Sequence, residues 1–360
     1  MKWIGYFLFL IILVSCNTSH DNNNSTLIDF SKINDFNKEK INIDNLFDKF
    51  KLIELETNEE SLIGGRAVKV IKKNNSYYVT SFNHILKFDS NGKFENRIIG
   101  GTGGPGDYGD ILDFDVVPEK NSILISGIGG LYDFSADSLK FRNKVEYPTY
   151  LSKFKYIGED KILARTPDEK VFQIFDLKGN FLDAYFDKEM ALSGQKIVDF
   201  IKIDNIYLSQ LDNTNQAVAY NPVNSEFKII DIINPSENLI SMEKELKIFQ
   251  ETDEFEFMKK INDTYTGISS FRELEGQYIL ILNHPHGVWS MVCIPQEGSI
   301  TNNIYFPDAR STIVNNIVSQ IDPRYLNTMI STESDDSFIF IMDSLEEEEN
   351  PSLLEVFSIK

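Results

Sequence analysis

Cysteine is scarce in this chain, with only two among 360 residues, so a disulfide framework does not hold the fold together. Basic residues are outnumbered, because 35 Lys and Arg face 55 Asp and Glu and give a net charge of -20. Such a field repels phosphate backbones, and nucleic acid is therefore not an expected partner. The chain is rich in phenylalanine and tyrosine, with 27 and 15 residues, and its 42% hydrophobic content indicates a folded, strand-prone protein.

The first residues have the pattern of a secretory signal peptide. Lys2 precedes an apolar run from Trp3 to Val14 that is too short to span a bilayer. Leu13-Val14-Ser15-Cys16 resembles the lipobox of bacterial lipoproteins, so we expect cleavage after residue 15 and a lipid anchor on Cys16. A plain signal peptide or an N-terminal anchor with an incidental cysteine are the alternatives. Residues 16–38 are polar and predict a flexible tether, followed by one domain over 39–360.

A hairpin pattern recurs along the domain. An aromatic residue is followed by Asp and, three positions after the Asp, by Gly in the predicted hairpins Phe88–Phe94 and Val171–Phe181. Two weaker copies bring the aromatic anchors to Phe88, Tyr132, Phe175 and Tyr220, which are 44, 43 and 45 residues apart. A repeat of this length, with two further strand patterns before each hairpin, is typical of four-stranded propeller blades.

The rest of the chain extends this repeat. Residues 265–306 predict a fifth blade, while 337–342 and 353–359 predict two strands of a sixth. The isolated strand pattern at 51–56 is expected to complete that last blade, because ring closure removes exposed sheet edges. Apolar residues at three- and four-residue spacing predict helices around 239–249 and 313–321. We therefore expect an all-β, six-bladed β-propeller closed by an N-terminal strand, with helical insertions on one face.

Three segments carry a resemblance to a known family. They are Leu55–Thr57 with Glu60–Gly64, the hairpin Phe88–Phe94, and the loop Gly103–Tyr108. On these segments the chain resembles the six-bladed β-propeller lipoproteins of Bacteroidetes, which are similar in shape to NHL-repeat propellers. The resemblance implies export, an anchored propeller in the cell envelope at the outer membrane, and a binding role. It brings no catalytic residue.

The expected binding site lies where several loops meet. In a propeller, the loops between the second and third strands of each blade open at the same end as the loops that cross between blades, around the axial funnel. Aromatic, amide and titratable residues occupy these loops, and we expect them to bind a small-molecule ligand, a glycan for instance, or a protein partner. These candidate ligand-binding residues are Phe82, Asn83, His84, Tyr108, Arg165, Asn283, His284 and His286.

Other sites are less well supported by the sequence. Gly101–Gly106 has the letters of the dinucleotide fingerprint, but Pro105 and the following polar residues cannot open the helix that it requires. His84, His284 and His286 with Asp107 offer metal ligands, yet His-Pro-His is not a metal-binding spacing, so no metal or cofactor is predicted. Two alternative functions stay open: a hydrolase or lyase that uses the axial funnel, with or without the assistance of a metal, and a scaffold in an outer-membrane protein complex.

Overall fold

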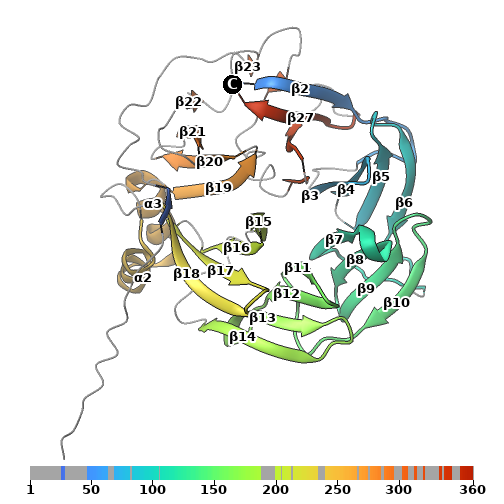
Figure 1. Ribbon diagram of the computed structural model, residues 1–360, viewed down its shortest axis with the longest axis horizontal. Helices are drawn as coiled ribbons and strands as arrows, with labels where there is room; N and C mark the ends of the chain where they lie inside the picture. Colours follow the sequence, from blue (N-terminus) through green and yellow to red (C-terminus); the bar gives the residue numbers. More distant parts are fainter. Residues whose placement is uncertain are drawn as a thin grey trace, which may run out of the picture.

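Six sheets of three to five strands surround a common axis in the computed structural model (Figure 1). The described residues are 26–28, 47–63, 69–81, 83–104, 106–187, 199–203, 205–211, 214–233, 240–265, 267–274, 276–284, 288–295, 302–306, 312–313, 319–320, 332–334, 336–342 and 349–359. The expected propeller is therefore confirmed.

The blades follow the chain. Blade 1 contains β3 (Lys69–Lys73), β4 (Ser76–Ser81), β5 (His84–Asp89) and β6 (Phe94–Ile99). Blade 2 contains β7 (Asp113–Val117), β8 (Ser122–Gly127), β9 (Gly130–Ser135) and β10 (Phe141–Val145). Blade 3 contains β11 (Lys153–Gly158), β12 (Lys161–Arg165), β13 (Lys170–Asp176) and β14 (Phe181–Asp187).

The remaining blades complete the ring. Blade 4 contains β15 (Ile201–Ile203), β16 (Ile206–Gln210), β17 (Gln216–Asn221) and β18 (Glu226–Ile233). Blade 5 contains β19 (Gly267–Leu274), β20 (Gln277–His284), β21 (Val288–Pro295) and β22 (Asn302–Phe306). Blade 6 contains three described strands, β26 (Phe338–Met342), β27 (Ser352–Ile359) and β2 (Phe47–Glu54).

The first strand of blades 1 to 5 lies nearest the axis and the fourth lies outermost (Figure 1). Strands that follow one another within a blade are antiparallel. The turns between first and second strands therefore lie at one end of the ring, which we call the turn end. The loops between second and third strands and the crossovers between blades lie at the other end, which we call the crossover end.

The N-terminal strand closes the ring as expected. β2 pairs antiparallel with β27, from Phe47 opposite Ile359 to Glu54 opposite Ser352. The side chain of Asn350 then ties the segment after β2 to blade 6: its Nδ2 donates to the carbonyl oxygens of Glu56 and Ser61 at 2.8 and 2.9 Å. Closure therefore joins the two ends of the domain by backbone and side-chain hydrogen bonds.

The repeated hairpin motif has one physical explanation in both copies. The Oδ1 atom of Asp89 accepts hydrogen bonds from the backbone N–H groups of Asn91 and Lys93, at 2.8 and 2.9 Å. Asp176 does the same for residues 178 and 180. Gly92 has φ +84°, and a Cβ there would overlap the carbonyl oxygen of Glu54 at the end of β2. The glycine thus allows the hairpin tip to pack against the preceding blade.

The core is divided among the interfaces between blades. One cluster packs blade 1 on blade 2, a second packs blade 2 on blade 3, and a third packs blade 3 on blade 4. The cluster that contains Ile53, Val70 and Ile339 joins blade 6 to blade 1 and so buries the closing strand. Apolar burial between blades, together with closure, holds the ring.

Only the first predicted helical insertion is helical in the described residues. α2 (Met242–Glu251) and α3 (Glu254–Thr264) follow blade 4 at the crossover end, capped by the side chains of Ser241 and Asp253. In the second segment, Thr312–Ile313 and Ser319–Gln320 form short antiparallel strands, β23 and β24, so a helix was the wrong prediction for these residues. The apolar spacing over 313–321 fits a helix, but the described residues form one pair of short strands instead. Residues 314–318 and 321 lie outside the described part.

Two short strands extend existing sheets. β25 (Thr332–Glu333) pairs parallel with β3 of blade 1. β1 (Thr26–Ile28), inside the segment expected as a flexible tether, pairs parallel with β18 of blade 4. Part of that segment is therefore attached to the propeller. Cys16 and the predicted signal peptide lie outside the described residues. Within the described part of the chain, no helix has the length and apolar character needed to cross a membrane.

Candidate binding cavity on the propeller axis

A cavity of about 860 Å³ lies on the axis, between the inner strands of blades 1 to 5 and, on the side of blade 6, Ser334 and residues 336–338. It reaches the turn end, because Lys73, Pro118, Glu119 and Gly158 all line it. Aromatic and charged side chains make up much of its wall. They are Phe154, Tyr156, Phe200, Tyr207 and Phe338, with Lys69, Lys73, Lys155, Lys202, Asp115, Glu119, Asp199, Glu273 and Asp336.

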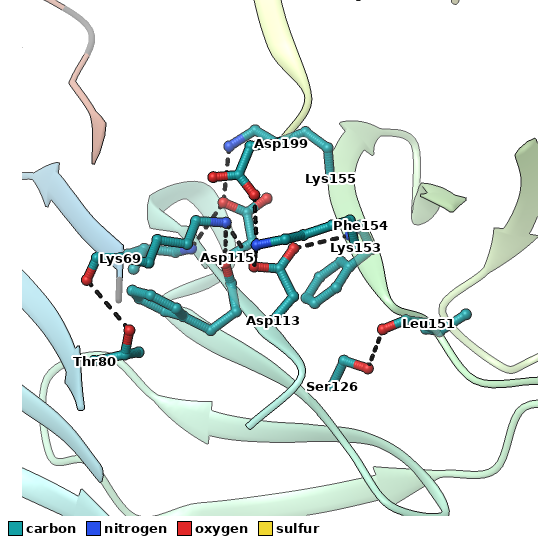
Figure 2. A network of polar contacts seen from close by, with 12 residues as sticks. Lys69, Thr80, Asp113, Asp115, Ser126, Leu151, Lys153, Phe154, Lys155 and Asp199 are labelled. Atoms are coloured by element: carbon teal, nitrogen blue, oxygen red, sulfur yellow. Dashed lines mark hydrogen bonds and ion pairs between the residues drawn. The ribbon is translucent and has the colours of Figure 1, made fainter. Parts of the chain in front are cut away.

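Alternating buried charges join four blades across the axis near the crossover end (Figure 2). The Lys69 ammonium of blade 1 lies 2.8 Å from the Asp113 carboxylate of blade 2. The Lys153 ammonium of blade 3 lies 3.5 Å from that carboxylate and 2.6 Å from the Asp199 carboxylate of blade 4. We call this series, Lys69–Asp113–Lys153–Asp199, the ion-pair ladder. All four side chains are at most 10% exposed.

Two carboxylates of blade 2, Asp113 and Asp115, accept backbone hydrogen bonds from blade 3. Asp113 Oδ2 accepts from the N–H of Phe154 at 3.0 Å, and Asp115 Oδ2 accepts from the N–H of Tyr156 at 2.9 Å. Inner strands of neighbouring blades belong to separate sheets, so these side chains replace the backbone hydrogen bonds that a continuous sheet would supply. Asp115 is further paired with the Lys155 ammonium at 2.8 Å.

Lys153, between two carboxylates, keeps its charge within the ladder. Burial alone would lower the pKa of Lys153, but the carboxylates of Asp113 and Asp199 outweigh that effect and raise the pKa above its ordinary value. The ammonium therefore stays protonated at neutral pH. A buried ammonium with a carboxylate on each side holds those carboxylates in place. Removing the ammonium would lower the stability of the fold, because a buried carboxylate would lose its counter-charge.

The wall towards the turn end is less buried and offers groups to a ligand. Tyr156 is half-buried, and the Lys202 ammonium is exposed 5.9 Å from the centre of the Tyr207 ring. On the side of blade 6, the Ser337 hydroxyl donates to the Glu355 carboxylate at 2.5 Å, and the Ser334 hydroxyl donates to Asp336 at 2.9 Å. Aromatic faces, donors and acceptors thus surround one space, as in sites for small polar molecules.

The predicted site residues at the crossover end have structural partners. The Asn83 side chain donates to the Gly100 carbonyl at 2.9 Å, and the Asn83 carbonyl accepts from the Tyr108 hydroxyl at 2.8 Å. His84 is the first residue of β5 and pairs with Ser81 and Ile99. Partial burial and the nearby Arg97 charge lower the pKa of His84. The structure therefore brings Asn83 and Tyr108 together, but through a bond that organises the loop.

Two of the predicted ligand-binding residues are buried, contrary to their expected place on an open loop face. Tyr108 is 1% exposed and packs edge-on against Tyr132 and Phe134 in the core between blades 1 and 2. Arg165 ends β12, is 4% exposed, and its guanidinium lies 6.0 Å from the centre of the Phe172 ring. Aromatic and charged character in a loop does not distinguish a core anchor from a ligand contact.

The other predicted residues are only partly described. Asn283 and His284 end β20, where their backbones pair with Trp289 and Val288. Phe82 and His286, like the side chains of Asn283 and His284, lie outside the described part of the structure. Their role in binding therefore stays a prediction.

Asp107, considered above as a metal ligand, organises its own loop. Its carboxylate accepts hydrogen bonds from the N–H groups of Gly101, Gly103 and Gly109 at 2.6, 2.6 and 2.9 Å. These bonds lower the pKa of Asp107. Within the described residues, no group of three or more His, Cys, Asp or Glu side chains is arranged to hold a metal ion.

The cavity-lining charges were missed in the sequence, although a signal was present. Lys69, Asp115 and Lys155 are buried on the first strands of blades 1 to 3, and each is next to at least one buried apolar residue. A charged side chain inside a buried strand needs a partner of opposite sign, so the recurrence of such residues on the first strand of consecutive blades indicates an axial charge network.

Three of the solved structures that superpose on the chain come from Bacteroides species. A Bacteroides fragilis protein described as exported superposes with a TM-score of 0.66 at 17% identity, covering 89% of this chain and 98% of its own. A Bacteroides caccae protein has a TM-score of 0.45 at 12% identity, covering 67% and 82%. The extracellular domain of a B. thetaiotaomicron two-component system protein has a TM-score of 0.44 at 11% identity, covering 85% and 39%.

No curated protein sequence matches the chain. At sequence identities of 17% or less, the similarity to solved structures concerns the fold alone. It agrees with the ring of blades described above. A family model described as a 6-bladed beta-propeller matches residues 17–287, which include the closing strand β2, blades 1 to 4, and β19 and β20 of blade 5. The chain therefore belongs to this family, DUF5128, of six-bladed β-propellers.

Proposed function

We propose that the protein is an exported binding module, held in the cell envelope at the outer membrane by a lipid on Cys16, and that its axial cavity binds a small polar ligand such as a glycan. The Lys2 to Cys16 segment supports the export and the anchor. The single observation that carries the binding role is the cavity itself. Its volume of about 860 Å³ falls within the range of sites that enclose small ligands.

The chemistry of the wall supports a polyhydroxylated ligand. Hydroxyl groups need both donors and acceptors, which the ammonium groups of Lys73 and Lys202 and the carboxylates of Glu119 and Glu273 supply from four different blades. The apolar faces of a sugar ring need flat apolar surface, which Tyr156 and Tyr207 supply. The ion-pair ladder lies across the crossover end of this space, so the ligand enters from the turn end.

The test measures ligand-dependent stability of the full chain in detergent. A panel of neutral, amino and acidic saccharides, with free amino acids as polar controls, is screened by thermal unfolding, because a ligand that binds only the native state raises the midpoint. We expect a saccharide to raise it, and Tyr156→Leu to weaken that binding about tenfold, which corresponds to about 1.4 kcal/mol.

The matched control is Tyr150→Leu. Tyr150 is a 57% exposed tyrosine in the crossover between blades 2 and 3, at the opposite end of the ring. Its replacement should leave binding unchanged. Binding that responds to Tyr150 or Asn83 instead of Tyr156 would move the site to the crossover end, and a panel without any shift would contradict the proposed ligand class.

A further inference from the structure

The outer edge of blade 4 carries a strand from the distant N-terminal segment. β1 pairs parallel with β18, with Thr26 opposite Asp231 and Ile28 opposite Ile233 (Figure 1). The corresponding outer strands of blades 1 to 3, β6, β10 and β14, have no such neighbour among the described residues. An outer strand presents unpaired N–H and C=O groups, and β1 satisfies part of this edge in one blade only.

We propose that β1 clamps the N-terminal segment onto blade 4 and thereby holds this side of the propeller next to the lipid surface in which Cys16 is anchored. The proposal rests on the lipid anchor of the proposed function. It adds that the anchored propeller has a preferred orientation relative to the bilayer. One blade faces the bilayer, and the partner of the blade 4 side is a lipid surface.

The length of chain between anchor and clamp limits the distance. From Cys16 to Thr26 there are ten Cα–Cα steps, which span at most about 36 Å when fully extended. Without the clamp, the next strand is β2, which begins at Phe47, and the 31 steps to it span up to about 110 Å. β1 therefore shortens the reach of the tether about threefold and replaces the attachment at blade 6 by one at blade 4.

Blades 1 and 4 lie on opposite sides of the ring, and their outer hairpins offer matched reporter positions (Figure 1). Val223, at the tip between β17 and β18, is 81% exposed, and its N–H donates to the Asn221 side chain at 2.9 Å. Asn91, at the tip between β5 and β6, is exposed, and its N–H donates to the Asp89 side chain at 2.8 Å. The two tips share this side-chain-to-backbone hydrogen bond and differ in their place around the ring.

The experiment compares energy transfer from these two tips to the bilayer. The lipidated full chain, in a Cys293→Ser background, carries a donor dye at Val223→Cys or Asn91→Cys and is reconstituted in phosphatidylcholine vesicles with an acceptor on the lipid headgroups. We expect at least twofold more efficient transfer from position 223. Replacing residues 26–28 by three prolines, which removes every N–H of β1, should abolish the difference. Three valines at the same positions should preserve it.

A disulfide tests the clamp without a membrane. Residues 28 and 233 are directly opposite in the register, so Ile28→Cys with Ile233→Cys should form a disulfide on oxidation. Ile28→Cys with Asn143→Cys, on the outer strand of blade 2, should not. A missing 28–233 disulfide, or equal transfer from both tips of vesicle-bound protein, overturns the proposal while the lipid anchor stands. A chain that incorporates no acyl label and does not bind vesicles overturns the anchor and, with it, the placement at the membrane.

Discussion

Replacing Lys153 by methionine tests the ion-pair ladder most directly. The Lys153 ammonium contacts two carboxylates, Asp199 at 2.6 Å and Asp113 at 3.5 Å, whose side chains are 6% and 1% exposed. Lys153→Met leaves Asp113 with Lys69 but removes the ammonium from Asp199. Removing one partner of a buried pair typically costs 3–5 kcal/mol, so we expect the free energy of unfolding to fall by about 4 kcal/mol in urea denaturation followed by circular dichroism.

The control is Lys161→Met in the same blade, where the pair with Glu159 lies in solvent and its loss should leave the midpoint unchanged. The effect of Lys153→Met should also depend on pH. A buried carboxyl that has lost this ammonium has a raised pKa in the folded state, so its penalty is present above the pKa of the unfolded state and shrinks as pH falls towards 4. Adding Asp199→Leu to Lys153→Met should recover most of the stability. A loss below about 1 kcal/mol, or one that is independent of pH, would refute the electrostatic explanation of the ladder.

Two other substitutions test local features. Gly92→Ala should lower the free energy of unfolding at least twice as much as Gly158→Ala. Both glycines have positive φ, +84° and +89°, but only at Gly92 would the new Cβ meet the backbone of the preceding blade. Equal losses of unfolding free energy would contradict the packing explanation. The pKa of Tyr77 is raised by its burial and by its hydrogen bond to Glu355, so its contribution is complete below the pKa of about 10 of an unfolded tyrosine and is lost as pH rises further. The stability of wild type and Tyr77→Phe should therefore converge between pH 10 and 11 in unfolding titrations, by up to about 1.4 kcal/mol per pH unit, and curves that stay parallel would exclude this role.

The ring itself could be predicted because its signals are local. The aromatic-Asp-x-x-Gly pattern marks hairpins through side-chain hydrogen bonds within five residues, as at Asp89 and Asp176, and its spacing along the chain gives the length of a blade. The closing strand could be predicted because one strand pattern before blade 1 belonged to no blade and the last blade lacked a strand. Placing the first in the second completes the ring. Strand boundaries differ from the prediction by a few residues, as at β2, since apolar patterning does not fix where pairing stops.

The second helix was a wrong prediction and the strand within the expected tether was not foreseen, for a related reason. Apolar spacing near Ile313 and Ile317 fits a helix, yet the described residues around it pair as strands, so periodicity over so short a segment does not decide between the two. The polar composition of residues 16–38 predicts a free linker, but a strand of three residues needs only an open edge, which β18 provides. Local composition contains no information about such distant edges.

The site could not be found from conspicuous residues. Histidine and asparagine at the crossover end attract attention, but Asn83 and Tyr108 bond to each other and the loop of Asp107 folds around its own carboxylate. The cavity is lined instead by ordinary lysines and acids on inner strands, whose meeting on the axis depends on how neighbouring blades pack. Only the structure shows which charges pair: Lys69 with Asp113, and Lys155 with Asp115.

In the proposed function, some axial charges hold the blades together and others contact the ligand. Asp115 and Lys155 line the cavity, but both also join blades 2 and 3, so changing either would alter the ring together with any ligand site. Lys202 and Glu119 line the same cavity and are exposed, Lys202 on blade 4 and Glu119 in the turn after β7. Substitutions at the turn end can therefore change the ligand specificity with little loss of stability. A single substitution in the ladder at the crossover end would instead destabilise the fold. A homologue that binds a different ligand should accordingly keep the ladder and differ at positions equivalent to 119, 156 and 202.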